Sequence, residues 1–430
     1  MTHDWVALSC DPAAPERTAT ALLELLQRRC WVRLVGLQEG ALQGEEQLPA
    51  LQQQSALWPE GPGLVLSTGG SSGGRSLCLH PLANLERSAE VCGRWLQGLG
   101  LDPESCLVWN PLPFQHVSGL MPWWRARQWG ASHGWLAPEL MKQPSVLLAQ
   151  CRQHPGWRQL PMVLSLVPTQ LRRLLAHPEG CSWLQAMDVI WVGGAALPLD
   201  LAARSRQAGL RLAPCYGATE TAAMVTVQTP QAFLAGHRSC GQPLEGVRLR
   251  LDPDGALAVH CDRLAVARLD PAGGLQALVD AQGWWRTGDL ATLGDAEVAP
   301  DLQVMGRRDG ALQSGGVTVF PEQLEDRLLG LAAQAGLPLS AVLMLGLPDP
   351  EWGARLVALV RWSTSDRDAA RMDALRALVS GWPAAERPRR WVPCADLAPS
   401  RAGKWERRRW QTWLLSQQSA QQQEQDVDVV

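Results

Sequence analysis

The chain has 430 residues, of which 46% are hydrophobic and 19% are charged, and its formal net charge is −3 at pH 7. This length and composition are sufficient for a large hydrophobic core and predict two domains. The small net charge argues against a nucleic-acid or anionic-membrane partner. No stretch of about 18 apolar residues is present, and the first residues lack the basic and apolar regions of a signal peptide, so a cytoplasmic protein without a membrane span is expected.

Two features of the composition bear on chemistry. The 11 cysteines are scattered and include no C-x-x-C pair, which is typical of reduced core thiols rather than of a disulfide or zinc framework. Among 39 basic residues only Lys142 and Lys404 are lysines, and Tyr216 is the single tyrosine. Because arginine has replaced lysine almost everywhere else, the remaining lysines are candidates for chemistry that arginine cannot perform.

The first half of the chain alternates between helical and strand-like patterns, with a Gln-, Glu- and Pro-rich linker over residues 38–62. Three- and four-residue apolar spacing predicts helices over residues 19–29, 82–99, 169–176 and 199–208. Short apolar runs predict strands over residues 63–66, 105–109, 162–167 and 187–192. This alternation predicts an α/β fold whose parallel sheet carries functional loops at one edge.

The pattern changes after about residue 240. Short alternating stretches at residues 247–251 and 256–260, separated by turn sequences, predict an antiparallel β region. The pattern of residues 310–415 predicts a small α+β domain. Helices are expected over residues 321–331 and 372–379, and strands over residues 341–347 and 355–362. The Gln-rich, acidic tail over residues 416–430 is expected to be disordered.

The most informative stretch follows the strand predicted at residues 63–66. Residues 67–74 contain four glycines and four hydroxyl side chains, whereas a turn needs only one or two glycines. Such a loop suits backbone N–H groups and hydroxyls that converge on a phosphate, since any Cβ would block a close approach. The alternative is a flexible Gly/Ser linker.

This loop is the first of five motifs whose order and spacing resemble those of the adenylate-forming superfamily, which holds acyl-CoA synthetases, peptide-synthetase adenylation domains and firefly-type luciferases. The motifs are residues 67–76, 216–221 (Tyr-Gly-Ala-Thr-Glu-Thr), 286–290 (Arg-Thr-Gly-Asp-Leu), 306–325 (Gly-Arg-Arg-Asp, then Ser-Gly-Gly and Pro-Glu-Gln-Leu-Glu) and 400–404 (Ser-Arg-Ala-Gly-Lys). The resemblance implies a large N-terminal domain over residues 1–308, built of parallel-rich sheets with helices plus a β-rich subdomain. It also implies a small, mobile α+β C-terminal domain over residues 309–415.

The resemblance further implies that a carboxylate attacks the α-phosphate of ATP, that pyrophosphate leaves, and that CoA then attacks the acyl-adenylate, with Mg²⁺ on the phosphates. The residues expected to hold the ATP phosphates are Ser67, Thr68, Gly69, Gly70, Ser71, Ser72, Gly73, Gly74, Arg75 and Thr219. Those expected at adenine and ribose are Gly193, Gly194, Ala195, Tyr216, Gly217, Ala218, Asp289 and Arg307. Lys404 and His116 are expected to be catalytic, Glu220 to bind the metal, Asp309 to be the hinge, and Ser314, Gly315 and Gly316 to line the CoA channel.

The side-chain chemistry agrees with these implied roles. A hard cation that bridges phosphate oxygens needs a carboxylate such as Glu220, and Asp289 can accept from two ribose hydroxyls. The Tyr216 ring can stack on adenine, and Lys404 can neutralise the carboxylate and the α-phosphate together. Taken alone, each residue has a plainer alternative: a solvated Glu, a turn Asp, a core Tyr or a surface Lys.

Within the superfamily the chain most resembles the o-succinylbenzoate–CoA ligases of menaquinone and phylloquinone synthesis. The similar stretches are residues 114–120 and 165–171. The substrate has a second carboxylate that needs a cation, for which Arg173 is the candidate, while His116 and Ser118 are expected to line the acyl pocket. A surface arginine on an amphipathic helix is the alternative for Arg173, and Arg172 beside it should point elsewhere.

Two departures from the superfamily pattern matter. Arg75 stands where a lysine is usual, and only about 60 residues precede the phosphate loop, so the first subdomain is missing a part or is reduced. A Walker-type NTPase is disfavoured because its Gly-Lys pair is absent. Ligases for other carboxylic acids and a catalytically inactive nucleotide-binding homologue stay as alternatives, and whether the chain forms a homodimer is left open.

Overall fold

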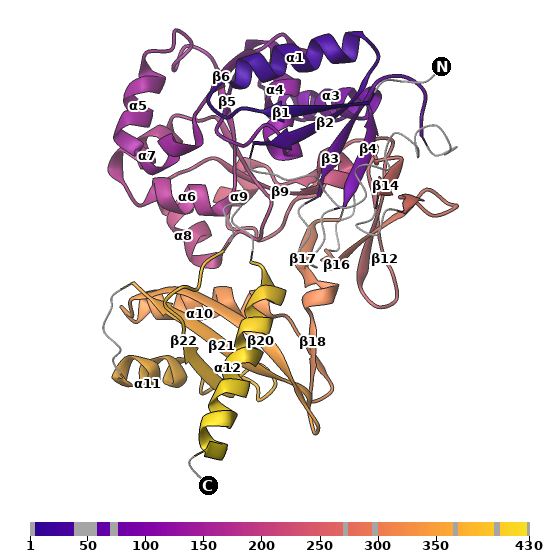
Figure 1. Ribbon diagram of the computed structural model, residues 1–430. Coiled ribbons are helices and arrows are strands. Elements are labelled where there is room, and N and C mark those ends of the chain that lie inside the picture. The colour runs from indigo at the N-terminus through magenta and orange to yellow at the C-terminus, as the bar shows by residue number, and fades with distance from the viewer. Residues whose placement is uncertain are drawn as a thin grey trace. The chain divides into compact units, whose positions relative to one another are not determined.

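A computed structural model describes residues 5–37, 58–68, 76–269, 274–294, 300–363, 369–399 and 405–427. The chain divides into two compact units (Figure 1). The N-terminal unit holds nearly all described residues up to Val304, and the C-terminal unit holds Gly288–Leu290 and Met305–Val430. The boundary predicted after Arg308 lies a few residues beyond this division.

The largest sheet of the N-terminal unit has seven strands in the order β11-β10-β9-β8-β7-β5-β6. The five strands from β9 to β6 are parallel to their neighbours, and β10 and β11 extend one edge in antiparallel fashion. The strands are β5 (Leu107–Asn110), β6 (Ser132–Trp135), β7 (Met162–Leu166), β8 (Val189–Val192), β9 (Leu212–Ala218), β10 (Ala223–Val227) and β11 (Gln242–Pro243). The predicted α/β architecture with a parallel sheet is confirmed.

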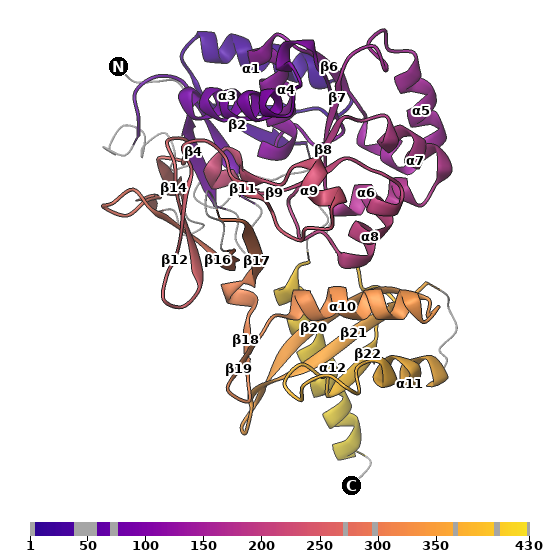
Figure 2. The same ribbon diagram turned by 180° about the vertical axis from the view of Figure 1, so that it is seen from behind.

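Helices cover both faces of this sheet. One face packs against five helices: α5 (Pro144–Arg152), α6 (Pro168–Leu175), α7 (Pro178–Gln185), α8 (Leu199–Gln207) and α9 (Pro230–Leu234). The other packs against α3 (Leu82–Gly98) and α4 (Val117–Trp129), which Figure 2 shows from behind. Short 3-10 helices add η2 (Pro103–Ser105), η3 (Pro138–Lys142) and η4 (Thr219–Thr221).

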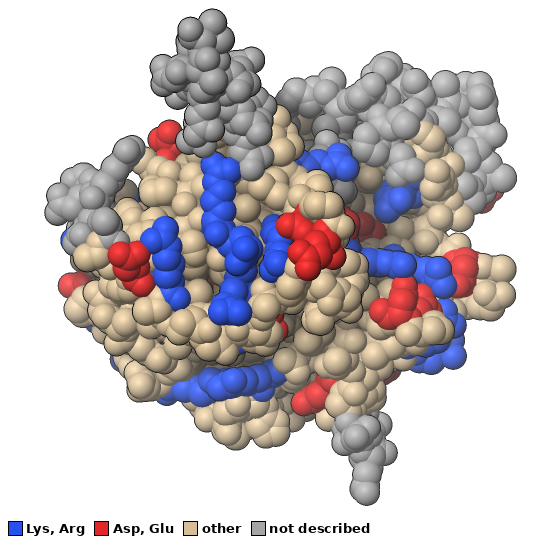
Figure 3. All heavy atoms as spheres, turned by 90° about the horizontal axis from the view of Figure 1, so that it is seen from below, with Lys and Arg blue, Asp and Glu red and all other residues tan. Residues whose placement is uncertain are grey.

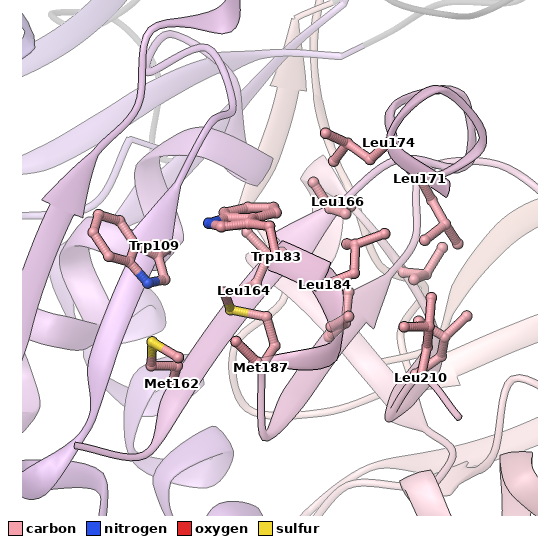
Figure 4. Close-up of a cluster of buried hydrophobic side chains, with 14 of the residues drawn as sticks. Trp109, Met162, Leu164, Leu166, Leu171, Leu174, Trp183, Leu184, Met187 and Leu210 are labelled. Atoms are coloured by element: carbon pink, nitrogen blue, oxygen red, sulfur yellow. The ribbon is translucent and has the colours of Figure 1, made fainter. Parts of the chain in front are cut away.

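The two-residue period of the strands sorts their side chains between these layers. Trp109 and Leu164 lie in the cluster with Trp183 and Met187, whereas Val108 and Val163 face the opposite layer. Figure 4 shows Trp109, Trp183 and Met187 directed into this cluster. Trp183 is completely buried, so truncating it to alanine would cost about 3–5 kcal/mol.

A second sheet of the N-terminal unit has six strands in the order β1-β2-β3-β4-β14-β15. Its strands are β1 (Trp5–Cys10), β2 (Trp31–Gly36), β3 (Gly63–Ser67), β4 (Leu77–Pro81), β14 (Ala267–Leu269) and β15 (Leu275–Ala277), and α1 (Pro15–Gln27) packs against it. The sequence reading did not anticipate β1 and β2. Arg33 interrupts the apolar run of β2, although this side chain is 1% exposed in the fold.

A four-stranded sheet in the order β12-β13-β16-β17 forms the predicted antiparallel region. Its strands are β12 (Arg248–Leu251), β13 (Ala256–His260), β16 (Trp285–Leu293) and β17 (Leu302–Arg307). The expected hairpin is present, because β12 and β13 pair antiparallel with Leu251 opposite Leu257. Asp252–Gly255 closes it, with the Gly255 N–H donating to the Asp252 carbonyl at 2.8 Å.

The C-terminal unit has its own core around a sheet in the order β19-β18-β21-β20, with β22 paired to β21. Its elements are η5 (Arg308–Gly310), β18 (Leu312–Ser314), β19 (Val317–Val319), α10 (Pro321–Gln334), β20 (Leu339–Asp349), β21 (Gly353–Trp362), α11 (Ala369–Leu378), β22 (Arg390–Pro393) and α12 (Arg407–Val427). Helices α10 and α11 pack on one face and α12 on the other, which is the predicted α+β arrangement.

The segment expected to be disordered, residues 416–430, begins within helix α12 (Arg407–Val427). Helix α12 continues to Val427. Leu414 and Trp410 anchor its first turns in the core, and the Gln, Ala and Glu residues that follow are good helix formers. A polar composition indicated disorder here, yet a helix that tertiary contacts have already nucleated propagates readily through such residues.

None of the described helices is long and apolar enough to cross a membrane. On the face drawn in Figure 3, Lys and Arg side chains (blue) are interspersed with Asp and Glu side chains (red). That face therefore presents no field of a single sign.

Candidate active site

The predicted phosphate loop connects two buried antiparallel strands, β3 and β4. Ser67 lies opposite Leu77 in their register, and the backbone beyond this pair is closed by two hydrogen bonds. The Thr68 N–H donates to the Ser76 carbonyl at 2.8 Å, and the Ser76 N–H donates to Thr68 Oγ1 at 3.2 Å. The seven predicted ligands between them, residues 69–75, lie outside the described residues.

The Tyr-Gly-Ala-Thr-Glu-Thr motif is a tight corner between β9 and β10. Thr221 is completely buried, and its hydroxyl accepts from the Ala218 N–H at 2.9 Å while bonding to the Ala218 carbonyl at 3.0 Å. Gly217 lies directly against β10, where a Cβ would be 2.1 Å from the Ala223 carbonyl oxygen. The glycine is therefore required by the close approach of the two strands.

This corner contacts the start of the phosphate loop. The Thr219 hydroxyl donates to the Ser67 carbonyl at 3.5 Å, and the Ser67 hydroxyl is buried with no hydrogen-bond partner among the described residues. On its other side the Thr219 carbonyl accepts from His80 Nε2 of β4 at 2.8 Å. Three of the residues predicted to act on the ATP phosphates, Ser67, Thr68 and Thr219, are thus brought together by the fold.

Glu220 follows Thr219 on η4 and is half-buried. Its carbonyl accepts from the Ala265 N–H at 2.8 Å. The pKa of the Cys78 thiol on β4 is raised, mainly by burial and next by the negative charge of Glu220, which places the carboxylate close to the strand that leaves the phosphate loop.

The residues around Glu220 suit a magnesium ion that is also bound by substrate phosphates, rather than a metal ion held entirely by protein side chains. Within the described ranges no group of three or more His, Cys, Asp and Glu side chains could hold a metal ion. Mg²⁺ is commonly bound through one or two carboxylates together with substrate phosphates and water. One carboxylate beside a phosphate loop is the donor set that such an ion needs.

The predicted adenine residues meet at the carboxyl ends of β8 and β9. Val192 pairs with Pro214, so Gly193 and Cys215 are neighbours, and a Cβ on Gly193 would be 2.9 Å from Cys215 Sγ. Gly194 has a φ of +81° and is exposed together with Ala195. Tyr216 is half-buried on the neighbouring strand, so the glycine loop and the tyrosine ring share one edge of the sheet.

The predicted acyl residues His116 and Ser118 begin helix α4 at the end of β5, on the same sheet. Asn110 holds this junction, because its Nδ2 donates to the Gly119 carbonyl at 2.8 Å. A Cβ at Gly119 would be 2.1 Å from the Pro113 carbonyl oxygen, so the chain turns closely here. His116 is half-buried as the residue before the helix, and Ser118 is exposed.

The two arginines of α6 have different environments, as expected. Arg172 forms a bidentate pair with Asp200 of α8, with nitrogen–oxygen distances of 2.6 Å and 3.0 Å. Arg173 is exposed on the neighbouring face of the helix. Arg172 therefore ties α6 to α8.

The ribose-binding residues expected in the Arg-Thr-Gly-Asp and Gly-Arg-Arg-Asp motifs lie in the C-terminal unit. Arg307 bridges two carboxylates, with its Nη1 3.5 Å from Asp289 Oδ1 and its Nε 3.1 Å from Asp309 Oδ1. Asp289 is the less exposed of the two acids, at 15% against 44%. Gly288 has a φ of +79° and allows β16 to pass beside the Arg307 guanidinium.

The Ser-Gly-Gly sequence expected in the CoA channel forms the turn between β18 and β19. Ser314 pairs with Val317, and the two residues between them, Gly315 and Gly316, have φ values of +58° and +80°. A two-residue hairpin with two positive φ angles strongly favours glycine. Trp352 lies against this turn, since a Cβ on Gly315 would be 2.6 Å from its ring.

Lys404 lies outside the described residues, but the helix that follows it is firmly anchored. Arg407 at the start of α12 forms a bidentate pair with Glu325 of α10 at 2.9 Å and 2.8 Å, and its Nε is 3.0 Å from Glu322. The Arg407 Nη1 also donates to the Met344 carbonyl at 2.8 Å. Burial raises the pKa of Glu325 to about 7, and Arg407 opposes that rise.

Sequence reasoning missed the residues that hold the motifs in place. His80, Asn84 and Thr221 are buried and form hydrogen bonds at the corner around Thr219. Thr221 belongs to a predicted motif but was given no role, and His80 and Asn84 lie outside all five motifs. A usable signal was present: a single histidine inside the apolar strand Leu77–Pro81, four residues before an asparagine. A buried polar side chain normally has a partner, so such a residue predicts a structural contact to a loop.

A family model described as AMP-binding enzyme matches residues 7–261. Because this match spans more than half of the chain, the chain belongs to that family of enzymes. The curated proteins that the chain is similar to include several 2-succinylbenzoate–CoA ligases.

The relative from Salmonella typhimurium (strain LT2), named 2-succinylbenzoate–CoA ligase, is 28% identical over 417 residues, which cover 95% of this chain and 81% of that protein. A probable 2-succinylbenzoate–CoA ligase from Mycobacterium tuberculosis (strain CDC 1551 / Oshkosh) is 30% identical over 361 residues, covering 80% of this chain and 83% of that protein. The 2-succinylbenzoate–CoA ligase from Bacillus velezensis is 30% identical over 199 residues, covering 44% of this chain and 39% of that protein.

Among solved structures, the chain is similar to wild-type E. coli MenE with a bound m-phenylether-linked analogue of OSB-AMS. The TM-score is 0.67 and the identity 25%, and the match covers 97% of this chain and 89% of that chain. The agreement extends through both units, so the fold is that of an adenylate-forming enzyme.

Proposed function

We propose that the protein is an ATP-dependent acid–CoA ligase that activates o-succinylbenzoate as an acyl-adenylate and transfers the acyl group to CoA, in menaquinone or phylloquinone synthesis. The observation that carries this proposal is the likeness to the Salmonella 2-succinylbenzoate–CoA ligase over 95% of the chain. The corner at residues 216–221, fixed against the phosphate hairpin, agrees with it.

In the first step a carboxylate oxygen of the acid attacks the α-phosphorus of ATP, the bond to the β-phosphate oxygen breaks, and pyrophosphate leaves. The loop that begins at Ser67 holds the departing phosphates, and Thr219 stands beside it. Tyr216 stacks on adenine while Asp289 and Arg307 hold the ribose. Mg²⁺, held by Glu220, would neutralise phosphate charge. Negative charge builds on the α-phosphate oxygens, so positioned donors and cations lower the barrier.

In the second step the CoA thiol attacks the acyl carbon, AMP leaves, and the thiol proton passes to solvent. We assign to Lys404 the bridging of the acid carboxylate and the α-phosphate in the first step. We assign to Asp309 the role of the hinge about which the C-terminal unit rotates between the two steps. The hairpin Ser314-Gly315-Gly316 is assigned to the pantetheine channel.

The second carboxylate of o-succinylbenzoate requires a cation in the acyl pocket. Arg173 is assigned this role because it is exposed, whereas Arg172 already pairs with Asp200. His116 and Ser118 lie at the start of α4 and are assigned to the acyl pocket, with His116 close to the reacting carboxylate. A cytoplasmic location and a homodimer are also proposed, and light scattering of the purified protein tests the second.

The function is tested by pyrophosphate release with Mg-ATP across a panel of carboxylic acids. We expect o-succinylbenzoate to give the highest kcat/KM, and formation of its CoA thioester confirms the second step. If another acid exceeds it by ten-fold or more, the ligase alternative with different specificity holds. If no acid releases pyrophosphate, the inactive-homologue alternative holds.

The Lys404→Ala variant separates the two steps. We expect it to lose adenylation by at least about 100-fold, because a positioned cation at the developing charge is removed. Thioester formation from pre-made acyl-adenylate should stay within about three-fold of the unsubstituted enzyme, with Lys142→Ala as the matched control. Equal losses in both steps would contradict the role assigned to Lys404.

A further inference from the structure

His80 is completely buried in β4 and uses both ring nitrogens. Its Nε2 lies 2.8 Å from the Thr219 carbonyl oxygen and its Nδ1 lies 3.3 Å from Asn84 Nδ2. A carbonyl can only accept and an amide NH₂ can only donate, so the ring is the neutral tautomer that carries its proton on Nε2. The second Asn84 N–H donates to the Leu264 carbonyl at 2.8 Å, which fixes the orientation of the amide.

These bonds join three stretches that are distant in the sequence: residues 80–84, residues 219–220 and residues 264–265. His80 lies on the strand that leaves the phosphate hairpin, and Asn84 lies on the first turn of α3. The Thr219 carbonyl lies on the corner after β9, and Leu264 directly precedes Ala265, whose N–H donates to the Glu220 carbonyl at 2.8 Å. The same threonine donates from its hydroxyl to Ser67 at the other strand of the hairpin, at 3.5 Å.

We propose that His80, oriented by Asn84, is a positioning residue for the adenylation step: its Nε2–H holds the Thr219 carbonyl, and so fixes the Thr219–Glu220 turn relative to the phosphate loop. This inference rests on the proposed function. His80 is buried and touches no ligand itself, so it acts only through Thr219 and Glu220.

The geometry explains why this position needs a ring with one donor and one acceptor. An apolar side chain would leave the Thr219 carbonyl without its buried partner and would let the turn move away from the hairpin. Displacements of about 1 Å in a phosphoryl-transfer site can cost on the order of 100-fold in rate. Thioester formation does not use the pyrophosphate end of this site and should be spared.

The test compares His80→Leu, which removes the donor, with His80→Gln, whose amide can donate from about the place of Nε2. Each is assayed for acid-dependent pyrophosphate release at a series of Mg²⁺ concentrations, and for thioester formation from pre-made acyl-adenylate. We expect His80→Leu to lower the adenylation kcat by about 30-fold or more and to raise the Mg²⁺ concentration that is needed. His80→Gln should recover most of the rate, and both variants should form thioester within about three-fold of the unsubstituted enzyme.

The control is His133→Leu, which alters a half-buried histidine on β6 whose Nε2 is shielded from solvent and has no hydrogen-bond partner among the described residues. Its adenylation rate should not change. If His80→Leu does not fold, Asn84→Ala decides, since it removes only the group that orients the ring; a selective loss of adenylation is expected. A parallel loss in both half-reactions, or no loss of adenylation, would overturn the positioning role. The unsubstituted enzyme reports separately on the proposed function, because it releases pyrophosphate with o-succinylbenzoate and forms the CoA thioester only if that function is correct.

Discussion

Gly217 is the residue at which a single methyl group would meet the backbone of the neighbouring strand. The added Cβ would be 2.1 Å from the Ala223 carbonyl oxygen and 2.5 Å from Met224 Cα, so β9 and β10 would have to separate. Both atoms belong to the backbone and cannot rotate away. The corner that carries Thr219 and Glu220 depends on this close contact.

We expect Gly217→Ala to lower the free energy of unfolding by about 1–3 kcal/mol and to slow adenylation by at least about ten-fold. Urea unfolding and pyrophosphate release measure the two effects. Gly98→Ala is the control, because no atom lies within 4 Å of its Cβ position and its φ is negative. Normal adenylation by Gly217→Ala would show that the corner tolerates the separation.

Loss of contact with water shifts the pKa of two histidines: His80 is completely buried, and His133 is half-buried with its Nε2 shielded from solvent. Burial lowers the pKa of His80 to about 4 and that of His133 to about 3, against 6.5 for the free side chain. In the unfolded chain these rings take up protons below about pH 6.5, whereas in the folded chain they stay neutral. The stability that they contribute is therefore complete above pH 6.5 and is lost as the pH falls toward 4.

When the pH is lowered from 7.5 to 5, we expect the free energy of unfolding to fall by about 2 kcal/mol for each of the two histidines. The measurement is the urea midpoint at the two pH values for the unsubstituted protein and for His133→Gln, which cannot titrate. The variant should lose about half of the pH dependence that the two rings produce together. An identical pH dependence would mean that His133 is not shielded from solvent.

At the scale of elements, a largely buried ion pair helps the apolar contacts of Trp410 and Leu414 to attach α12 to the C-terminal unit. The Glu325 side chain is 6% exposed and that of Arg407 is 19% exposed, and Glu325 also accepts from the Met344 N–H at 2.6 Å. Replacing Glu325 would leave Arg407 with Glu322 as its remaining carboxylate partner, at 3.0 Å, and replacing Arg407 would leave the Glu325 carboxylate buried without that cation. Replacing both with apolar groups of similar size is often neutral.

We expect Glu325→Leu to destabilise the C-terminal unit by about 3 kcal/mol, and the double substitution Glu325→Leu with Arg407→Met to recover most of this loss. Hydrogen exchange of the α10 and α12 peptides reports the effect locally. Arg409→Met is the control, because Arg409 pairs with Glu406 at 3.3 Å on the surface, where such pairs contribute little. Equal effects of the single and double substitutions would show that Arg407 gains nothing from Glu325.

At the scale of the whole molecule, the described residues fold as two units with separate cores. The predicted hinge Asp309 lies on η5, directly after the strand β17 that ends at Arg307. Its carboxylate is 3.1 Å from Arg307 Nε, so the hinge and the proposed ribose contact share one ion pair.

We expect Asp309→Pro to retain adenylation within about three-fold and to lose most thioester formation, because proline fixes φ at this position and restricts the residue before it. The two half-reactions are measured separately, with pre-made acyl-adenylate for the second. Asp309→Ala controls for the loss of the carboxylate. Unimpaired thioester formation by the proline variant would place the hinge elsewhere.

The sequence by itself determined the order of the motifs, the parallel α/β core and the antiparallel region around Val247–Leu251, because periodicity and glycine-rich turns are local properties of the chain. It also separated Arg172 from Arg173, since adjacent residues on a helix point in different directions. The strand β2 was missed because Arg33 interrupts its apolar run, and β1 was missed as well. Contacts of Trp410 and Leu414 start a helix at Arg407 that the composition of the tail does not suggest.

Only the tertiary structure decided what holds the motifs together. The corner at Thr219, the hairpin after Ser67 and the buried His80 are separated by up to about 150 residues, and their hydrogen bonds span that distance. Buried polar partners are chosen by geometry after the strands have paired, and no local pattern encodes which carbonyl a histidine will reach. The sequence therefore names the chemical groups of the proposed site, and only the tertiary structure shows which carbonyl the buried His80 holds.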